Sequence, residues 1–327
     1  MQQYPIPLRE EPVTGWAAPN YFKCAGIYQN LLAQAEKLRR HNRQGSYKTR
    51  TRYFEAFQRF LRYLAETYRL ENLGNLSGKH LASYVEYMQY RNLSPSTIKT
   101  DLAAIRFWHD QIPHAKFALP GNEELDLERR KFGRVDRSWS TGEVNRMLAK
   151  CLDENHEDFA ACIVLARYAA LRLHEVLRLD TATARAALQC GCLTIKGKGG
   201  KVRWVPINHT VTVELERLLL QTAPGQKLFV PKGKQTHVVR AELQSFILIH
   251  KREVQDKDSR RPLTFHGLRH TCAAEWYQRL VSEGKTELEA RLQVSKWLGH
   301  ERDDVTKVYL AGLPQARQEE GGGVNGR

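Results

Sequence analysis

One stretch of this sequence, from Pro120 to Arg137, breaks the apolar periodicity that runs through the residues on both sides of it. It begins with Pro120-Gly121 and continues as a mostly charged and polar run with little material for a core. The 327 residues leave enough chain on each side for a separate core. We therefore expect two domains joined by an exposed linker. The expected segments are an N-terminal extension (1–20), a helical domain (21–115), the linker (116–138), a second domain (139–315) and a disordered tail (316–327).

The charge balance indicates a polyanionic partner. The chain has 51 Lys and Arg against 36 Asp and Glu, a formal net charge of +15. The excess is divided almost equally between residues 1–138 and 139–327, so it is not a basic tail. This distribution favours contact with a nucleic acid along the whole molecule, although charge alone does not separate nucleic acid from an anionic membrane surface.

Several protein classes are excluded by local features. The first residues contain no apolar segment of the kind found in secretory signals. The longest apolar run, Phe159–Ala166, is far shorter than the ~20 residues that span a bilayer. The pair Cys190 and Cys192 has the wrong spacing for a zinc knuckle. We expect a soluble cytoplasmic protein with reduced thiols, no metal and no membrane contact.

The first domain is expected to be helical throughout. Helices are predicted over 21–40 and 76–90, and a third carries one apolar stripe that contains Phe57 and Leu61. A fourth begins at Ser94-Pro95, because serine is a good N-cap and proline fits the first turn. Its polar side would carry the candidate DNA contacts, which are Thr97, Lys99 and Arg106.

The second domain is predicted to combine helices with one small antiparallel sheet. Ser140 and Glu143 fit a capping box, which places a helix start there. Two β-branched runs, 192–195 and 202–207, flank a turn rich in glycine and lysine and predict a hairpin. The rest is helical until Pro314. The expected fold class is therefore mainly α with a small antiparallel sheet, or α+β.

Two clusters combine basic residues with apolar surroundings. Arg172 adjoins a segment apolar enough for a core, and Glu175 lies three residues on, where it would share a helical face. A simple Arg–Glu pair explains this spacing as well as a functional site does. His266 and Arg269 would project from one face of a helix start behind Thr264, a position that suits phosphate binding. An ordinary polar helix start is the alternative.

Two further features are ambiguous when taken alone. The hairpin turn contains Lys196, Lys198 and Lys201, but it lacks the Ser or Thr and the following helix of a phosphate-binding P-loop. It is either a solvated basic turn or a mobile lysine that reaches a ligand. Tyr309 follows Leu298-Gly-His300 by nine residues, and a tyrosine alone is most often a packing residue.

Taken in order, these features resemble the tyrosine recombinase (lambda-integrase-like) family, whose signature is Arg, Lys, His-x-x-Arg, His or Trp, and Tyr. The segment 169–176 is similar to the family's T-G-L-R-x-x-E-L, and 264–271 is similar to T-x-H-x-L-R-H-T. The hairpin resembles G-K-G-x-K-x-R-x-x-P, and 298–300 matches L-G-H. The likeness extends over the helical domain, which resembles the family's SAM-like core-binding domain. Only about the first twenty residues and the tail fall outside the resemblance.

The sequence departs from the family pattern in two places. Ala169-Ala170 replaces the usual Thr-Gly before Arg172, a change expected to alter local packing without touching the guanidinium. The stretch between Arg269 and Leu298 is long, and we expect a loop insertion near Ser282.

The resemblance implies a role for each matching residue. Tyr309 would be the nucleophile, Arg172 and Arg269 would stabilise the phosphate, and Lys198 would be the general acid, with Lys196 and Lys201 as alternatives. His266 would exchange a proton with the tyrosine, His300 would bond the scissile phosphate, and Glu175 would orient Arg172 or His266. Such chemistry requires neither a metal nor ATP, because the phosphotyrosine stores the bond energy.

The function implied is site-specific DNA recombination of the integrase type through a 3′-phosphotyrosine. Double-stranded DNA would be the partner, bound by a homotetramer on two sites. Two alternatives remain: a type IB topoisomerase, which shares the chemistry, and a non-catalytic DNA-binding clamp. The complete residue set argues against the second alternative.

Overall fold

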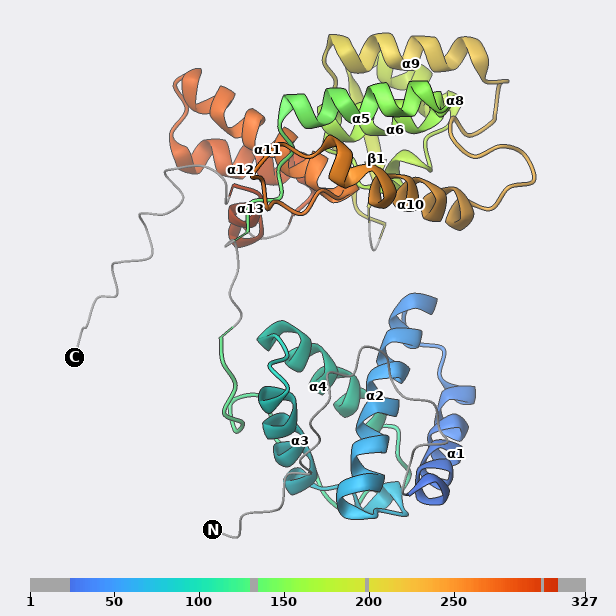
Figure 1. The fold of residues 1–327 in the computed structure, drawn as a ribbon, viewed down its shortest axis with the longest axis vertical. Coiled ribbons are helices and arrows are strands. Elements are labelled where there is room, and N and C mark those ends of the chain that lie inside the picture. The colour runs from blue at the N-terminus through green and yellow to red at the C-terminus, as the bar shows by residue number, and fades with distance from the viewer. Residues whose placement is uncertain (1–23, 130–134, 198–199, 301–302, 311–327) are drawn as a thin grey trace, which may run out of the picture. The chain divides into compact units, whose positions relative to one another are not determined.

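The computed structural model describes residues 24–129, 135–197, 200–300 and 303–310. The chain divides into two compact units, Met1–Lys131 and Phe132–Arg327. Helices dominate both units, and the described residues form one two-stranded antiparallel sheet (Figure 1). The predicted fold class is confirmed.

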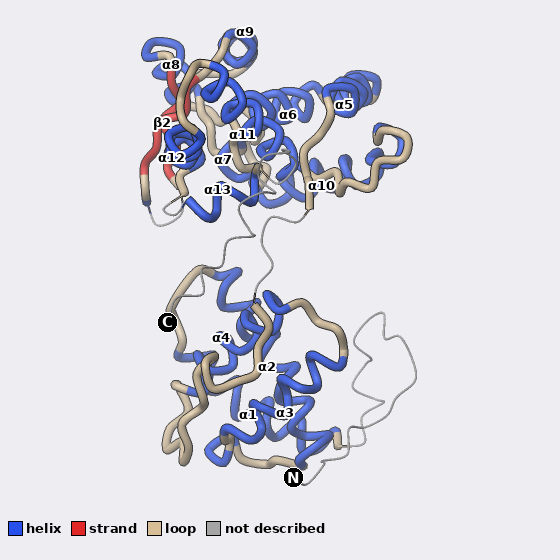
Figure 2. Tube along the Cα trace, turned by 90° about the vertical axis from the view of Figure 1, so that its left-hand side faces the viewer, coloured by secondary structure: helices blue, strands red, loops and turns tan. Residues whose placement is uncertain are grey.

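The described residues of the first unit form a bundle of four helices with a short 3₁₀ turn at Leu73–Asn75. The helices are α1 (Ala25–His41), α2 (Tyr47–Tyr68), α3 (Gly78–Tyr90) and α4 (Pro95–His109). Helix α2 packs against the other three (Figure 2). Its predicted stripe is the core, since Phe57 and Leu61 are fully buried together with Trp108 of α4.

The start of α4 follows the prediction. The Ser94 side chain accepts a hydrogen bond from the backbone N–H of Thr97, with Pro95 in the first turn. The Thr97 hydroxyl itself lies 2.9 Å from that of Ser94. Lys99 is half-buried on the same helix.

The guanidinium of Arg106, a predicted DNA contact, is engaged within its own unit. Its Nε donates to the carbonyl oxygen of Pro120 at 2.8 Å, and Nη1 donates to Oδ1 of Asn122 at 2.9 Å. Its Nη2 is buried. The guanidinium is therefore occupied in holding the segment after α4 against the bundle, which counts against a role in binding DNA.

The second unit has its helices around a central pair, α6 and α11. Helices α5 and α9 pack against α6, α10 packs against α5, and α12 packs against α11 and the hairpin (Figures 1 and 2). The elements are α5 (Thr141–Asp153), α6 (Glu157–Ala169), α7 (Leu173–Val176), α8 (Thr181–Cys190), β1 (Cys192–Lys196), β2 (Val202–Pro206), α9 (His209–Gln221), α10 (Thr236–Val254), α11 (Phe265–Ser282), α12 (Glu287–Leu298) and α13 (Asp303–Tyr309).

Two local predictions are confirmed in this unit. Ser140 and Glu143 form the reciprocal capping box at the start of α5. Strands β1 and β2 pair antiparallel, with Ile195 opposite Arg203. The tip of the hairpin, including Lys198, lies outside the described residues.

The predicted loop insertion between Arg269 and Leu298 is wrong. Helix α11 continues through Ser282, and the chain then turns at Gly284, whose φ is +91°. Thr286 caps α12 two residues later by accepting from the backbone N–H of Glu289. The extra length is therefore a second helix joined by a tight turn.

Candidate active site

Five segments of the second unit bring the candidate catalytic residues together. They are the start of α7, strand β2, the first turns of α11, the residue after the Gly299 cap of α12, and α13. The side chains that meet there are Arg172, Glu175, Arg203, His266, Arg269, His270, His300 and Tyr309.

Glu175 is the carboxylate that three guanidiniums of this site share. Its fully buried side chain accepts two bonds from Arg203, at 2.8 and 2.7 Å, and one from Nη1 of Arg172 at 3.0 Å. Nη1 of Arg269 lies 4.0 Å away. Burial alone would raise the pKa of Glu175, but the bonds and charge of Arg203 outweigh it and bring that pKa to about 2. The group is therefore a carboxylate across the physiological range.

Arg172 lies at the end of a turn rather than within a helix. It is the N-cap of the short α7, and its backbone N–H donates to the Glu175 carboxylate at 2.8 Å. Its side chain keeps 30% of its surface exposed. The predicted Arg172–Glu175 contact exists, but a capping interaction makes it, and the guanidinium still reaches solvent.

The turn before Arg172 requires a left-handed backbone. Ala170 ends α6 with φ +48° and ψ +34° and is buried. L residues are strained in this region whereas glycine is not, which explains why the family pattern has glycine here. The Ala170 carbonyl accepts a hydrogen bond from Nη1 of Arg269, so the turn also positions the second arginine.

Arg269 is completely buried. Its Nη2 donates to the carbonyl oxygen of Leu298 and lies 3.5 Å from Nε2 of His300. Burial lowers the pKa of Arg269 to about 10, so the guanidinium keeps its charge at neutral pH. Its Nε is buried with no hydrogen-bond partner among the described residues, so this donor is available to a ligand or a water molecule.

Tyr309 of α13 belongs to the same cluster. Its side chain is only 8% exposed, and its hydroxyl lies 3.2 Å from Nε2 of His266. The ring stacks on His270, with centroids 4.2 Å apart, and packs against His300 at 4.9 Å. Cζ of Arg269 lies 5.6 Å from the centre of the phenol ring. The phenol oxygen is thus held among imidazoles and a guanidinium.

The three histidines are uncharged at neutral pH. Burial, followed by neighbouring positive groups, lowers the pKa of both His270 and His300 to about 3. Desolvation and the guanidiniums of Arg269 and Arg172 also lower the pKa of His266. His266 as a residue is exposed, and its Nε2 lies 3.2 Å from the tyrosine hydroxyl. A neutral imidazole in this position is able to accept a proton from the phenol.

Two glycines allow the close approaches on which the site depends. Gly299 has φ +68°, and a Cβ there would lie 2.8 Å from Cδ of Arg203. A Cβ on Gly267 would lie 2.3 Å from the carbonyl oxygen of Arg137. At Gly267 the backbone of Arg137 leaves no room for a side chain, and at Gly299 the left-handed backbone and the Arg203 side chain both favour glycine.

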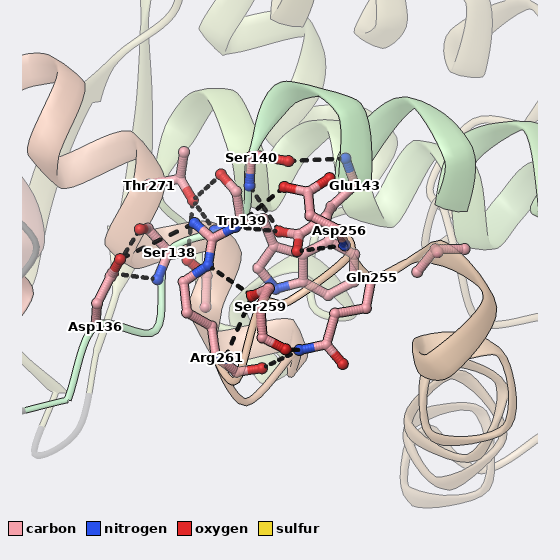
Figure 3. Close-up of polar contacts among 12 residues, drawn as sticks. Asp136, Ser138, Trp139, Ser140, Glu143, Gln255, Asp256, Ser259, Arg261 and Thr271 are labelled. Atoms are coloured by element: carbon pink, nitrogen blue, oxygen red, sulfur yellow. Dashed lines mark hydrogen bonds and ion pairs between the residues drawn. The ribbon is translucent and has the colours of Figure 1, made fainter.

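A polar network fixes the start of α11 against the first residues of the second unit (Figure 3). The Trp139 indole N–H donates to the carbonyl oxygen of Thr264 at 2.9 Å, and its backbone N–H donates to the hydroxyl of Thr271 at 2.7 Å. Arg261 contacts Glu143 at 3.2 Å and Asp256 at 3.3 Å. These contacts hold the turn of α11 that carries His266 and Arg269.

Sequence reasoning missed two residues of the site, Arg203 and His270. Arg203 is the arginine of the hairpin pattern, but its role depends on the alternation of β2, which turns it inward between two exposed residues. His270 lies one helical turn after His266, and this i,i+4 spacing was the available signal. Thr306, which is buried, adds a contact 3.2 Å from Nδ1 of His300.

The described residues contain no group of three or more His, Cys, Asp or Glu residues placed to hold a metal ion. In the same part of the chain no helix has the length and apolar character needed to cross a membrane.

Comparison with known proteins gives consistent matches along the chain. The model of the phage integrase family matches residues 139–315, and that of the N-terminal SAM-like domain of phage integrases matches residues 31–117. The tyrosine recombinase XerD of Halalkalibacterium halodurans is 23% identical over 291 residues, which cover 86% of this chain and 92% of that protein. The tyrosine recombinase XerC of Natranaerobius thermophilus is 23% identical over 287 residues, covering 84% and 91%.

Solved structures show the same fold. A lambda integrase dimer bound to a COC′ core site matches with a TM-score of 0.61 and 14% identity, covering 91% of this chain and 98% of that one. The Tn1549 transposon integrase in complex with transposon right end DNA matches with a TM-score of 0.57 and 16% identity, covering 86% and 94%. With the family match extending over more than half of its length, this chain belongs to the phage integrase family of tyrosine recombinases.

Proposed function

We propose that this protein is a site-specific DNA recombinase that cuts and rejoins strands through a 3′-phosphotyrosine on Tyr309. The observation that carries the proposal is the 3.2 Å contact between the Tyr309 hydroxyl and Nε2 of His266, beside the buried guanidinium of Arg269. A phenol held next to a neutral base and a fixed cation is suited to attack a phosphodiester.

Two guanidiniums are available to stabilise the charge that develops on the phosphate. Arg269 is buried and rigidly held, while Arg172 is partly exposed and anchored at one end by Glu175. Preorganised donors of this kind are each worth roughly 10²–10³ in rate. Arg203 binds the same carboxylate and acts by positioning, because its guanidinium is buried against Glu175.

The protons are proposed to move through two groups. The phenol proton passes to His266, an exposed residue, which exchanges it with solvent. Lys198 protonates the leaving 5′ oxygen, as the family pattern implies, with Lys196 and Lys201 as alternatives on the same hairpin. His300 bonds a phosphoryl oxygen. The phosphotyrosine conserves the energy of the broken bond, so rejoining needs no ATP.

Double-stranded DNA is the proposed substrate. Integrases with this fold have been solved on DNA, as a dimer in one case, and the basic excess in both halves of this chain suits the same partner. We infer that a homotetramer assembles on two sites in the cytoplasm. Thr97, Lys99 and the exposed Arg137 are the proposed contacts to DNA. The Xer relatives favour recombination over topoisomerase activity.

A suicide substrate tests the proposal. A duplex nicked next to the cleavage site should trap a covalent protein–DNA adduct in the presence of EDTA. Tyr309→Phe should abolish the adduct and leave duplex binding nearly unchanged. Tyr168→Phe, a matched change at a tyrosine of α6 that is not among the clustered side chains, should form the adduct normally. Relaxation of plasmids without strand exchange would indicate the topoisomerase instead, and binding without any adduct would indicate the non-catalytic clamp.

A further inference from the structure

The six cysteines of this chain differ sharply in their surroundings. Three are buried in the second unit, where burial raises the pKa of Cys151 and Cys272 to about 12 and also raises that of Cys162 well above its usual value. Buried thiols of this kind are inert. Cys24 is half-buried at the start of α1. Cys190 is exposed and Cys192 is partly exposed.

Cys190 and Cys192 face one another across a single glycine. Cys190 is the last residue of α8, and Cys192 is the first residue of β1. Their sulfur atoms lie 3.2 Å apart, and the Cys190 thiol also donates to the carbonyl oxygen of Cys192 at 3.1 Å. A disulfide bond is ~2.05 Å long, so the sulfurs need to approach by only about 1 Å.

The backbone between the two cysteines favours this pairing. Gly191 has φ +72°, and a Cβ built on it would meet no atom within 4 Å. The left-handed turn directs both thiols to the same side, and the open space around it lets the turn adjust. A hydrogen bond of 3.1 Å from Ile207 N–H to the Gly191 carbonyl keeps the base of the hairpin closed.

The two thiols also differ in the direction of their pKa shifts. A hydrogen bond from the thiol of Cys192 lowers the pKa of Cys190 and raises that of Cys192. The thiolate is the reactive form of cysteine, so Cys190 is the group that attacks first and Cys192 is the one that resolves. The order of attack follows from the accessibility of the pair as well, because Cys190 is the more exposed.

We propose that Cys190 and Cys192 form a reversible redox site that a small-molecule disulfide converts to an intrachain disulfide. The Cys190 thiolate attacks one sulfur of the external disulfide, forms a mixed disulfide and releases one thiolate. Cys192 loses its proton to solvent and attacks the Cys190 sulfur, which releases the second thiolate. Two electrons pass from the protein dithiol to the external disulfide. The new bond ties the last turn of α8 to the first residue of β1.

The test uses the full-length protein, reduced, desalted and equilibrated with mixtures of reduced and oxidised glutathione. After acid quenching, free thiols are alkylated and the protein is digested with trypsin. The peptide from Ala186 to Lys196 contains both cysteines. It should lose two hydrogens and resist alkylation, and its oxidised fraction should follow a two-electron titration. Cys151, Cys162 and Cys272 should remain reduced in the same samples.

Variants separate the roles of the two thiols. Cys192→Ser should stop at the mixed disulfide, so that glutathione stays on Cys190, while Cys24→Ser should titrate like the unaltered protein. The proposal is overturned if the wild-type peptide carries two glutathiones without closing, if Cys24 oxidises before the pair, or if the product is a disulfide between two chains. These readouts come mainly from the unaltered protein and so do not depend on the folding of a variant.

Discussion

Replacing Glu175 with glutamine removes the carboxylate that Arg172, Arg203 and Arg269 share. The side chains of Glu175 and Arg269 are fully buried and that of Arg203 is 8% exposed, so water cannot replace the lost charge. Glutamine has a similar shape and keeps one acceptor oxygen. The substitution therefore isolates the charge from the packing.

Two lines of reasoning give a similar loss in the free energy of unfolding. Removing one partner of a buried ion pair typically costs 3–5 kcal/mol, because the other charge stays buried without compensation. Independently, the pKa of Glu175 falls from 4.5 to about 2, which corresponds to about 3 kcal/mol of stability. Because the pKa is lowered in the folded state, this contribution is present above about pH 4.5 and is lost as the pH falls towards 2.

Urea unfolding of the full chain at pH 7, followed by tryptophan fluorescence, measures this cost. Glu175→Gln should lower the free energy of unfolding by about 3 kcal/mol, and the melting temperature should fall by roughly 6–12 °C for a unit of this size. Glu242→Gln is the matched control. Glu242 pairs with Lys234 at 2.6 Å, and the two side chains are 43% and 40% exposed. An exposed pair is worth about 1 kcal/mol or less. Equal costs for the two variants would refute the reasoning.

Three further changes test the site. In urea unfolding, the free energy of unfolding of Ala170→Gly should exceed that of Ala169→Gly by about 1–2 kcal/mol. Both changes remove a buried methyl group, but only Ala170 has a left-handed backbone. Equal free energies for the two variants would contradict backbone strain at Ala170. Gly267→Ala should cost about 1–3 kcal/mol and slow adduct formation, since its Cβ would lie 2.3 Å from the Arg137 carbonyl oxygen, whereas Gly26→Ala, with open space around it, should be neutral or stabilising. The free energy of unfolding should decrease as the pH is lowered below about 6.5. His270, with a pKa of about 3 in the folded protein, stays neutral there but takes up a proton in the unfolded chain. Between pH 6.5 and 5 this amounts to about 2 kcal/mol, and His270→Gln should flatten the pH dependence by that amount in urea titrations.

Signals that act over a few residues were readable from the sequence. The caps at Ser94 and Ser140 and the hairpin at 192–206 follow from local chemistry, and the structure has them where they were expected. The turn at 282–286 differs from the prediction, because the length of the stretch between Arg269 and Leu298 does not distinguish a loop from a second helix. Thr286 and Glu289 carry the same capping-box pattern as Ser140 and Glu143, so the signal for a second helix was present.

Contacts between segments far apart in the sequence were harder to predict from the sequence. The buried position of Arg203 depends on which face of β2 meets the core, and its bond to Glu175 joins residues that no local pattern relates. Arg106 was expected on a DNA-binding face, yet it binds Pro120 and Asn122, two residues of the predicted linker. The stacking of His270 on Tyr309 requires the position of α13, which the sequence order alone does not provide.

The central claim is that the Tyr309 oxygen becomes covalently joined to DNA. Digesting the trapped adduct with protease and nuclease, and sequencing the nucleotide-bearing peptide by mass spectrometry, tests this claim most directly. The account predicts a nucleotide attached through its 3′-phosphate to Tyr309 and to no other residue. A nucleotide on a different side chain, or a linkage through a 5′-phosphate, would contradict it.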